Sequence, residues 1–417
     1  MKQILYLECL LCGACYAPDE VDYVCPKHGN EGILDVVYDY EWIGWHTGRD
    51  TIQANPDPTI WRYRALLPLR PETPTPPLNI GGTPLYPVPR LAQANNLRHL
   101  WVKDDGRNPT ASFKDRASVI AVMKAHEKGA TMITTASTGN AAAALSGICA
   151  SVGQANVIFV PQSAPPAKIA QLLAFGSRVM LVQGSYDDAF ELCLQAANAF
   201  GWYNRNTGYN PYMSEGKKTA SLEICEQLAW QAPDVILVSV GDGCIIGGLY
   251  KGLKDLLALG WIERMPRLIG VQAAGSNYLA EAWARNEDVQ TKPAIAAQTI
   301  ADSISAGLPR DRIKAMNAVT QTHGAFVTVS DEEILAAIPT LARGCAVFAE
   351  PAGAAAFAGL LKALEQQLID KNERIVVVNT GSGLKDISSA MKSVQKVGPP
   401  ATSIAPTLEA LNQALRH

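Results

Sequence analysis

The sequence contains little charge and no long apolar run, and these two absences exclude several classes of protein. Only 18% of its 417 residues are charged, and the formal net charge is -3. Nucleic-acid-binding proteins normally present a basic face, so we expect no nucleic-acid partner. A membrane-spanning helix needs roughly 20 consecutive apolar residues, and no stretch approaches this. The opening MKQILYLECL is too short an apolar run for a signal peptide, which predicts a cytoplasmic protein without a membrane partner.

A disulfide framework is also not indicated, although the chain has nine cysteines. In cytoplasmic proteins, single cysteines among apolar residues usually act as small core hydrophobes. Five cysteines have such surroundings: Cys149, Cys193, Cys225, Cys244 and Cys345. The other four lie within the first 25 residues, which gives the N-terminus a separate character.

Two pairs of candidate metal ligands occur in this N-terminal segment. Cys9 and Cys12 are separated by two residues, and so are Cys25 and His28. This spacing is typical of the knuckles that hold tetrahedral zinc. The sequence therefore predicts a structural zinc site, with Cys15 as a spare ligand. The alternative is a degenerate ribbon that binds no metal.

Apolar segments of strand and helix length alternate along most of the chain, and 48% of all residues are hydrophobic. The predicted strands cover residues 99–105, 131–137, 156–161, 178–184, 234–241, 266–275 and 374–381. The predicted helices cover residues 112–129, 139–153, 167–176, 186–201, 217–230, 248–260, 331–344 and 350–368. Such alternation indicates parallel sheets with helices on both faces.

Composition divides the chain into four expected segments. Residues 1–35 form a zinc-ribbon-like segment, and residues 36–100 form a proline- and aromatic-rich arm that joins the large domain. Residues 101–205 are expected to form a small α/β domain that includes the region of Lys114. Residues 206–417 are expected to form a large α/β domain.

The segment NPTASFKDR, residues 108–116, places Lys114 where a loop passes into a predicted helix. Ser112 is the predicted N-cap of that helix. The positive end of the helix dipole and burial both favour a neutral lysine amine, which formation of a Schiff base requires. An isolated lysine of this kind is more often a solvated residue. The neighbouring motifs therefore decide whether Lys114 is a cofactor lysine.

Three further loops follow predicted strands: ASTGNAAAA (136–144), VGDGCIIGGLYKG (240–252) and NTGSGLKD (379–386). Backbone N–H groups at a helix start bind anions, and a glycine turn can form a phosphate cradle. The second loop lacks the Gly-Lys-Ser/Thr ending of a nucleotide P-loop. Each loop by itself is also compatible with an ordinary N-cap or turn.

In this order, the four segments resemble those of fold type II pyridoxal phosphate (PLP) enzymes, above all threonine synthase. Threonine dehydratase and cysteate synthase are relatives. The resemblance extends from the N-terminal knuckles to Asp386 and so covers most of the chain. It implies an α/β fold with two doubly wound open-sheet domains and an N-terminal zinc-ribbon-like extension.

The resemblance also implies a role for each motif. Lys114 would carry PLP as a Schiff base and later move the proton on the substrate's Cα, whereas Asn140 would contact the phenolic oxygen of PLP. Thr380 would contact the pyridine nitrogen, and a neutral hydroxyl there moderates the electron sink. The residues expected around the cofactor phosphate are Gly241, Asp242, Gly243, Cys244 and Ile245. The residues expected to bind the substrate are Ser112, Ser137, Thr138, Gly139, Lys217 and Lys218.

The substrate is where the sequence departs from the family pattern. Threonine synthases usually carry an Arg that binds the substrate phosphate in NP-x-R-x-x-G-Q-K-T, but here the segment is NPYMSEGKKT, residues 210–219. Met213 stands at the position of that Arg and cannot make charge-assisted bonds to a phosphate. Lys217 or Lys218 could compensate, as could Arg205, or the two lysines could simply start a solvated helix. Weak or absent activity on O-phosphohomoserine is therefore expected.

Two enzyme classes stay open at this point, each with a small amino-acid substrate. One is a threonine synthase-type lyase that acts on O-phosphohomoserine or a related amino acid by elimination and replacement. The other is a serine/threonine dehydratase-like ammonia-lyase or a cysteate synthase-like β-replacement enzyme. A non-catalytic zinc- and PLP-binding protein is disfavoured by the intact Lys114, Asn140 and Thr380. Homodimers are common among such relatives, and the sequence leaves the oligomeric state open.

Overall fold

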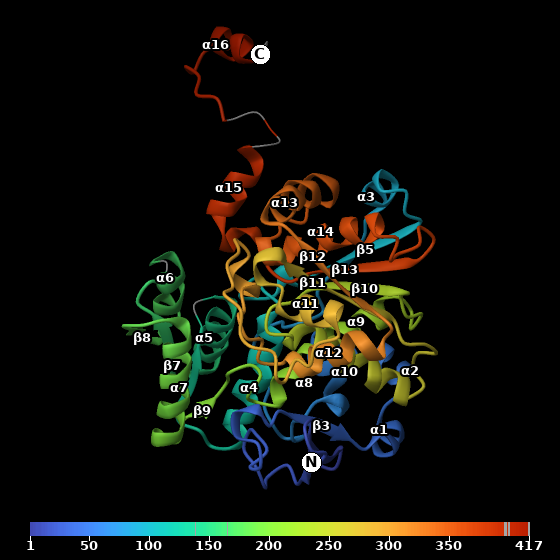
Figure 1. Cartoon of the computed structure of the whole chain (residues 1–417), viewed down its shortest axis with the longest axis vertical. Helices are drawn as coiled ribbons and strands as arrows, with labels where there is room; N and C mark the ends of the chain where they lie inside the picture. Colours follow the sequence, from blue (N-terminus) through green and yellow to red (C-terminus); the bar gives the residue numbers. More distant parts are fainter. Residues whose placement is uncertain (138, 165, 396–397, 399–400, 416–417) are drawn as a thin grey trace.

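The structure, a computed structural model, describes residues 1–137, 139–164, 166–395, 398 and 401–415. The chain begins with a three-stranded antiparallel sheet in the order β2-β1-β3, at the bottom of Figure 1. Its strands are β1 (Ile4–Cys9), β2 (Cys15–Tyr16) and β3 (Leu34–Tyr38). Residues 34, 36 and 38 of β3 are buried and the residues between them are less so, the period of a strand with one face on a core.

The proline-rich arm after this sheet winds over the body in short elements. These are α1 (Tyr40–His46), α2 (Arg49–Ala54), the 3-10 helix η2 (Ile60–Leu66), β4 (Leu85–Pro87) and α3 (Pro89–Ala94). The frequent prolines remove backbone donors, which keeps most of this segment out of regular ladders. β4 pairs with its neighbour only at the edge of a sheet, where a proline is tolerated.

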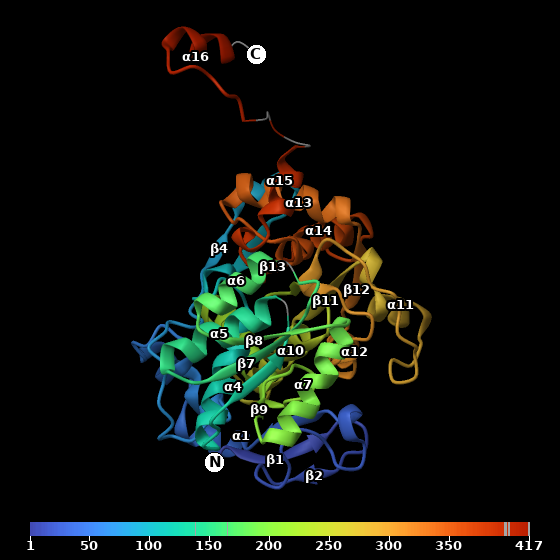
Figure 2. The ribbon, with the colours of Figure 1, turned by 90° about the vertical axis from the view of Figure 1, so that its left-hand side faces the viewer.

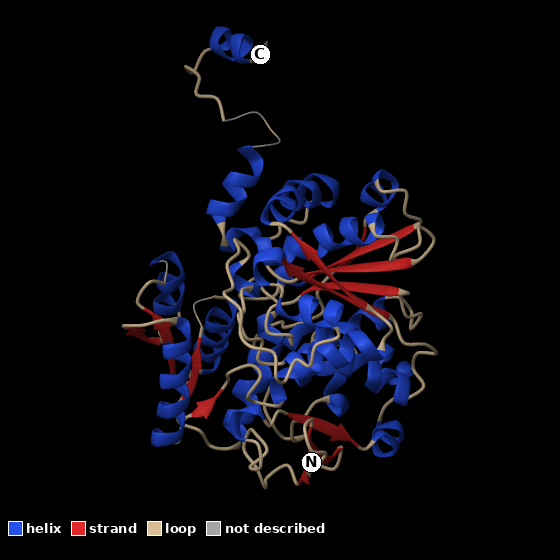
Figure 3. Cartoon of the chain, in the orientation of Figure 1, coloured by secondary structure: helices blue, strands red, loops and turns tan. Residues whose placement is uncertain are grey.

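The larger of the two α/β sheets has six strands in the order β12-β11-β10-β13-β5-β4, red in the right half of Figure 3. Apart from β4, its strands are parallel: β5 (His99–Asp104), β10 (Val235–Ser239), β11 (Arg267–Ala273), β12 (Ala325–Val329) and β13 (Arg374–Asn379). Side chains of β10 alternate between two cores, which is why this strand is apolar along its whole length.

Helices cover both faces of this sheet, as Figure 1 shows. Those on one face are α3, α13 (Asp331–Cys345) and α14 (Pro351–Glu365). Those toward the N-terminal sheet include α8 (Tyr212–Lys217), α9 (Thr219–Gln227), α10 (Cys244–Ala258) and α12 (Arg312–Gln321). The connection from β11 to β12 also contains α11 (Tyr278–Arg285).

The smaller α/β sheet has four parallel strands in the order β8-β7-β6-β9. They are β6 (Ile133–Ala136), β7 (Asn156–Pro161), β8 (Arg178–Val182) and β9 (Tyr203–Asn204). The helices of this part are α4 (Lys114–Glu127), α5 (Asn140–Val152), α6 (Pro166–Ala174) and α7 (Tyr186–Phe200). Val157 and Phe159 of β7 pack in one core with α7, while Ile158 and Val160 pack in the other with α5.

Two helices, α15 (Ile387–Gln395) and α16 (Leu408–Ala414), follow the last strand, and α16 lies apart from the body in Figures 1 and 2. No described helix is long and apolar enough to cross a membrane.

The α/β class and all the predicted strands and helices are confirmed, with small shifts at their ends. The helix expected at 217–230 starts earlier and is divided into α8 and α9. β12, α11 and α12 were not predicted. β5 belongs to the six-stranded sheet, because it pairs with β13, whereas the expected small domain 101–205 would have included most of it. The domain boundaries themselves stay a prediction.

Candidate active site

A cavity of about 510 Å³ lies at the carboxyl ends of strands from both α/β sheets. Ala136 at the end of β6 and Ser239 at the end of β10 line it, together with the starts of α4, α5 and α10. Ligands of open parallel sheets bind at this edge, because the loops and helix N-termini converge there. The geometry therefore marks this cavity as the candidate active site.

Lys114 is the first residue of α4 and lines the cavity. Burial lowers the pKa of its amine, and the nearby Arg205 charge acts in the same direction. A lowered pKa increases the neutral, nucleophilic fraction of the amine. The structure thus places the predicted lysine in the electrostatic setting that a Schiff-base lysine needs.

The segment before Lys114 is fixed by the loop after β13. The Phe113 N–H donates to the Thr380 carbonyl at 2.9 Å, and Ser112 forms a bridge with Gly381. Phe113, not Ser112, occupies the N-cap position, so the predicted cap was wrong. The Ser112 hydroxyl is instead buried, without a hydrogen-bond partner among the described residues, and does not line the cavity.

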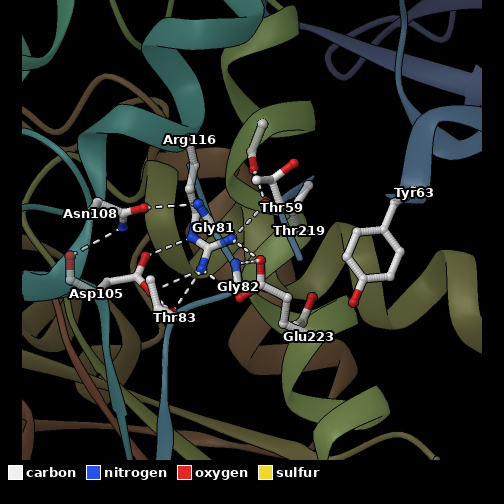
Figure 4. A network of polar contacts seen from close by, with 12 residues as sticks. Thr59, Tyr63, Gly81, Gly82, Thr83, Asp105, Asn108, Arg116, Thr219 and Glu223 are labelled. Carbon is white, nitrogen blue, oxygen red and sulfur yellow. Dashed lines mark hydrogen bonds and ion pairs between the residues drawn. The ribbon is translucent and has the colours of Figure 1, made fainter. Parts of the chain in front are cut away.

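Arg116, two residues after Lys114, anchors the start of α4 in the interior (Figure 4). Its guanidinium donates to the carboxylates of Asp105 and Glu223, each at 2.6 Å. It also donates to the hydroxyls of Thr83 at 3.0 Å and Thr219 at 2.9 Å. These partners come from three separate segments, so one side chain joins α4 to the arm, the loop after β5 and α9.

Glu223 of α9 extends this network to the glycine turn of the arm. It accepts the Gly82 N–H at 2.9 Å and the Lys103 ammonium at 2.6 Å. Burial opposes ionisation of Glu223, but the charges of Arg116 and Lys103 outweigh it and lower the pKa to about 2. A side chain at Gly82 would lie 1.9 Å from the Pro58 carbonyl oxygen, which explains the glycine there.

The predicted carboxylate loop starts α5 at the same cavity. Ser137, Gly139 and Asn140 line the cavity, while Thr138 lies outside the described residues. The Asn140 amide donates to the buried Glu350 carboxylate at 2.6 Å. Burial raises the pKa of Glu350. Sequence reasoning missed this contact, although Glu350 was visible as the charged residue before an alanine-rich helix.

The glycine loop between β10 and α10 also lines the cavity, from Gly241 to Ile245. Gly243 has a φ of 91°, and a side chain at Gly241 would lie 2.7 Å from the Ile304 Cα. The first N–H groups of a helix have no partner within the helix and can bind an anion. The Asp242 carboxylate accepts the Arg310 backbone N–H at 3.3 Å, which turns one of its oxygens to that loop.

The remaining predicted residues do not line the cavity. The Thr380 hydroxyl lies 3.5 Å from that of Ser239, which does line it. Lys218 is bound between Glu215 at 2.7 Å and Asp255 at 2.6 Å, so its predicted role in substrate binding is not supported by this placement. Lys217 and Met213 are fully buried.

One wall of the cavity comes from the segment 302–310, to which the sequence assigned no role. Ser303, Ser305 and Arg310 line the cavity from this side. Its sequence, IADSISAGLPRDR for residues 300–312, is rich in serine, glycine and proline, a composition typical of loops. No role could be assigned to these residues, because no predicted strand directly precedes them.

The N-terminal knuckles form a separate cluster. The ligand atoms of Cys9, Cys12, Cys25 and His28 all lie within 4.8 Å of one another. Cys15 is exposed and outside this group. The structure thus brings together the four predicted ligands and excludes the spare one.

Comparisons with known proteins agree with this geometry. A family model described as "Pyridoxal-phosphate dependent enzyme" matches residues 77–381. The threonine synthase of Methanocaldococcus jannaschii is 37% identical over 93% of this chain and 95% of its own length. That of Methanosarcina acetivorans is 37% identical over 98% of both chains.

Solved structures share the fold at lower identity. Threonine deaminase isoform 2 from Solanum lycopersicum superposes with a TM-score of 0.64 and 23% identity, over 76% of this chain and 83% of its own. An L-serine ammonia-lyase from Rhizomucor miehei gives a TM-score of 0.66 and 19% identity, over 75% and 98%. At such identities these likenesses define the fold alone.

Proposed function

Because the chain belongs to the pyridoxal-phosphate-dependent enzyme family and is of the threonine synthase type, we propose that it converts O-phosphohomoserine and water into threonine and phosphate. In this reaction the phosphate leaves the γ-carbon and water adds at Cβ. The observation that carries the proposal is the convergence of the partly buried Lys114 amine, whose pKa is lowered, with anion-binding groups in one cavity.

The residues around the cavity fit PLP. The Gly241–Ile245 loop offers unpaired N–H groups to a phosphate, and its glycines permit an approach that a Cβ would block. We assign Lys114 to the aldehyde carbon, Asn140 to the phenolic oxygen and Thr380 to the pyridine nitrogen. When bound, the cofactor supplies an electron sink for negative charge at the substrate's Cα.

The side chains of this chain perform the remaining tasks. The neutral Lys114 amine removes the Cα proton and returns it, since burial favours its uncharged form. The hydroxyl of Ser137 and the N–H groups at the start of α5 hold the substrate carboxylate. Enclosure between the two sheets limits access of water until Cβ is ready to receive it.

A substrate panel tests the assignment. Purified enzyme is given L-threonine, L-serine, O-phosphoserine and O-phosphohomoserine, and phosphate, keto acid and amino-acid products are measured. We expect phosphate and threonine to appear in equal amounts from O-phosphohomoserine, in spite of the methionine at position 213. Keto acid from threonine or serine, without phosphate release from O-phosphohomoserine, would overturn the proposal in favour of an ammonia-lyase.

The control for this panel is Lys114→Ala. We expect its turnover to fall by about a thousandfold or more, with an unchanged far-ultraviolet circular dichroism spectrum. It should also lose the visible absorbance band of a lysine-bound cofactor. Retained turnover would refute the role of Lys114.

We also propose that Cys9, Cys12, Cys25 and His28 hold one structural zinc ion. Three thiolates and one imidazole form a closed ligand set, which is typical of structural rather than catalytic zinc. The mutual proximity of the four ligand atoms supports this. Metal analysis of the freshly purified protein should find one zinc per chain, and a protein free of zinc would contradict the proposal.

A further inference from the structure

Two buried cations share one hydroxyl beside the cavity. Arg205 directly follows β9 and is 1% exposed, whereas Lys217 ends α8 and is 0% exposed. Arg205 Nη1 donates to Thr207 Oγ1 at 3.3 Å, and Lys217 Nζ donates to the same oxygen at 3.4 Å. The two positive charges therefore approach a single point on the loop between β9 and α8.

Neither cation forms an ion pair with a carboxylate of the described residues. Arg205 Nη2 is buried and has no hydrogen-bond partner among them. Other buried cations of the chain behave differently, because Arg116 and Lys218 each contact two carboxylates. Burying an unpaired charge is costly, so this pair is arranged for an anion that comes from outside the chain.

The pKa shifts of both groups agree with a role in binding an anion. Burial lowers the pKa of Arg205 to about 10 and that of Lys217 to about 8. For Lys217, the neighbouring charges of Lys114 and Arg205 act in the same direction. A bound dianion would reverse these shifts, which is the linkage expected of a phosphate-binding lysine.

The pair lies close to the backbone cradle at the start of α10, because Lys217 packs against Gly248 of that helix. Arg205 and Thr207 line the cavity that also contains Lys114, so an anion held by them stays beside the reacting centre. The Gly241–Ile245 loop offers backbone N–H groups, a second and independent set of donors. A reaction between PLP and a phosphorylated substrate needs two phosphate sites, and the cavity provides two.

We propose that Arg205, Thr207 and Lys217 bind the phosphate monoester of the substrate, in place of an arginine at position 213. The proposal rests on the threonine synthase-type function argued above. Met213 is fully buried and does not line the cavity. A cation at position 213 is not required, because Arg205 and Lys217 supply two positive charges from neighbouring segments. The cofactor phosphate is the other possible source of the same chemistry, and the test separates them.

The test compares Arg205→Met, Lys217→Met and the double variant with the wild-type holoenzyme. We expect each single variant to raise the KM for O-phosphohomoserine by about 10- to 100-fold, the loss expected for one charge-assisted bond. The dissociation constant of PLP, titrated by visible absorbance, should change by less than about twofold. Arg178→Met, which alters an exposed arginine outside the cavity, serves as the control and should leave both quantities unchanged.

Two outcomes would overturn the proposal. A loss of PLP affinity as large as the rise in KM would assign the cations to the cofactor, and an unchanged KM would leave them without a ligand. Arg205→Lys keeps a charge and covers the case in which the methionine variant does not fold, and it should recover part of the affinity.

Failure of the proposed function is recognised separately. If wild-type enzyme does not turn over O-phosphohomoserine, inorganic phosphate is titrated against the cofactor absorbance of the same proteins. If wild type binds phosphate and Lys217→Met does not, the anion site is upheld, although O-phosphohomoserine is not the substrate. Equal binding by wild type and variant would reject the site itself.

Discussion

Lys217 and Lys218 are neighbours in the sequence and equally buried, yet their surroundings are opposite. Lys218 lies between two carboxylates, and its ammonium also lies 3.8 Å from the centroid of the Tyr38 ring. Lys217 points to a hydroxyl and to other cations. Adjacent helical positions face directions about 100° apart, so one lysine joins two buried carboxylates while the other reaches Thr207, which lines the cavity.

The pH dependence of catalysis should therefore reveal Lys217. Burial lowers the pKa of its ammonium, the charges of Lys114 and Arg205 act in the same direction, and Asp311 opposes them. Since only the charged form attracts a phosphate dianion, kcat/KM for O-phosphohomoserine should fall as the pH rises through about 8. The thiol of Cys244 stays neutral in this range, because burial raises its pKa to about 12.

The comparison that checks this is a pH profile of wild type and Lys217→Met between about pH 7 and about pH 10. The variant should lack the alkaline decline near pH 8, at a lower overall kcat/KM. A decline that persists unchanged in the variant would assign it to another group.

At this scale, the sequence predicts residues held by local motifs better than residues held by distant partners. The cavity is lined as expected by Lys114, Ser137, Gly139, Asn140 and the glycine loop, because each lies in the connection from a predicted strand to a predicted helix. The contact from Asn140 to Glu350 joins residues 210 positions apart, and only tertiary packing sets it. Ser112 was misplaced for the same reason, since the loop after β13 fixes its backbone.

Among the elements, α4 depends most on polar anchoring. Arg116, Asp105 and Glu223 are buried near its start and neutralise one another, with Lys103 as a second cation. The helix carries Lys114 at its first position, so the network that fixes the helix also fixes the cofactor lysine. A buried ion network of this kind is stable only while all its members are present.

Arg116→Met tests this dependence. The substitution leaves two buried carboxylates short of a partner, which should lower the free energy of unfolding by about 3–5 kcal/mol. Urea denaturation followed by circular dichroism measures the change, with Arg178→Met as an exposed control expected within about 0.5 kcal/mol of wild type. A loss below about 1 kcal/mol would show that the network relaxes or admits water.

Element prediction succeeded where apolar and polar residues follow the period of a strand or a helix, and failed where they do not. The alternation of strands and helices from β5 to α7 is clear in the sequence, although β6 has only four residues. β12 has five residues and was not predicted, because it follows α12, in which polar and apolar residues are mixed. The division of residues 212–227 at Lys218 was not predicted either, because Lys218 keeps helical dihedral angles, with φ of -58° and ψ of -25°.

At the scale of the whole molecule, polar contacts to two helices join the N-terminal sheet to the rest of the enzyme. This sheet carries the cluster of metal ligands. Lys251 of α10 donates to the Val36 carbonyl at 2.6 Å, and Lys314 of α12 donates to the Leu34 carbonyl at 3.0 Å. The start of α10 carries the glycine loop of the cavity. The N-terminal sheet, at the bottom of Figure 2, thus supports the helices of the large sheet.

Loss of the metal should accordingly weaken the fold and spare the chemistry. Cys25→Ser removes a buried ligand, so bound zinc should fall well below one per chain and the Tm should drop by about 5 °C or more. The visible absorbance of the lysine-bound cofactor should persist at room temperature, because no zinc ligand lines the cavity.

Cys15→Ser is the matched control for Cys25→Ser. The Cys15 thiol is exposed and outside the cluster, so zinc content and Tm should stay unchanged. Equal zinc in both variants would show that the cluster does not hold the ion, and loss of the cofactor band in Cys25→Ser would show that the two sites are coupled.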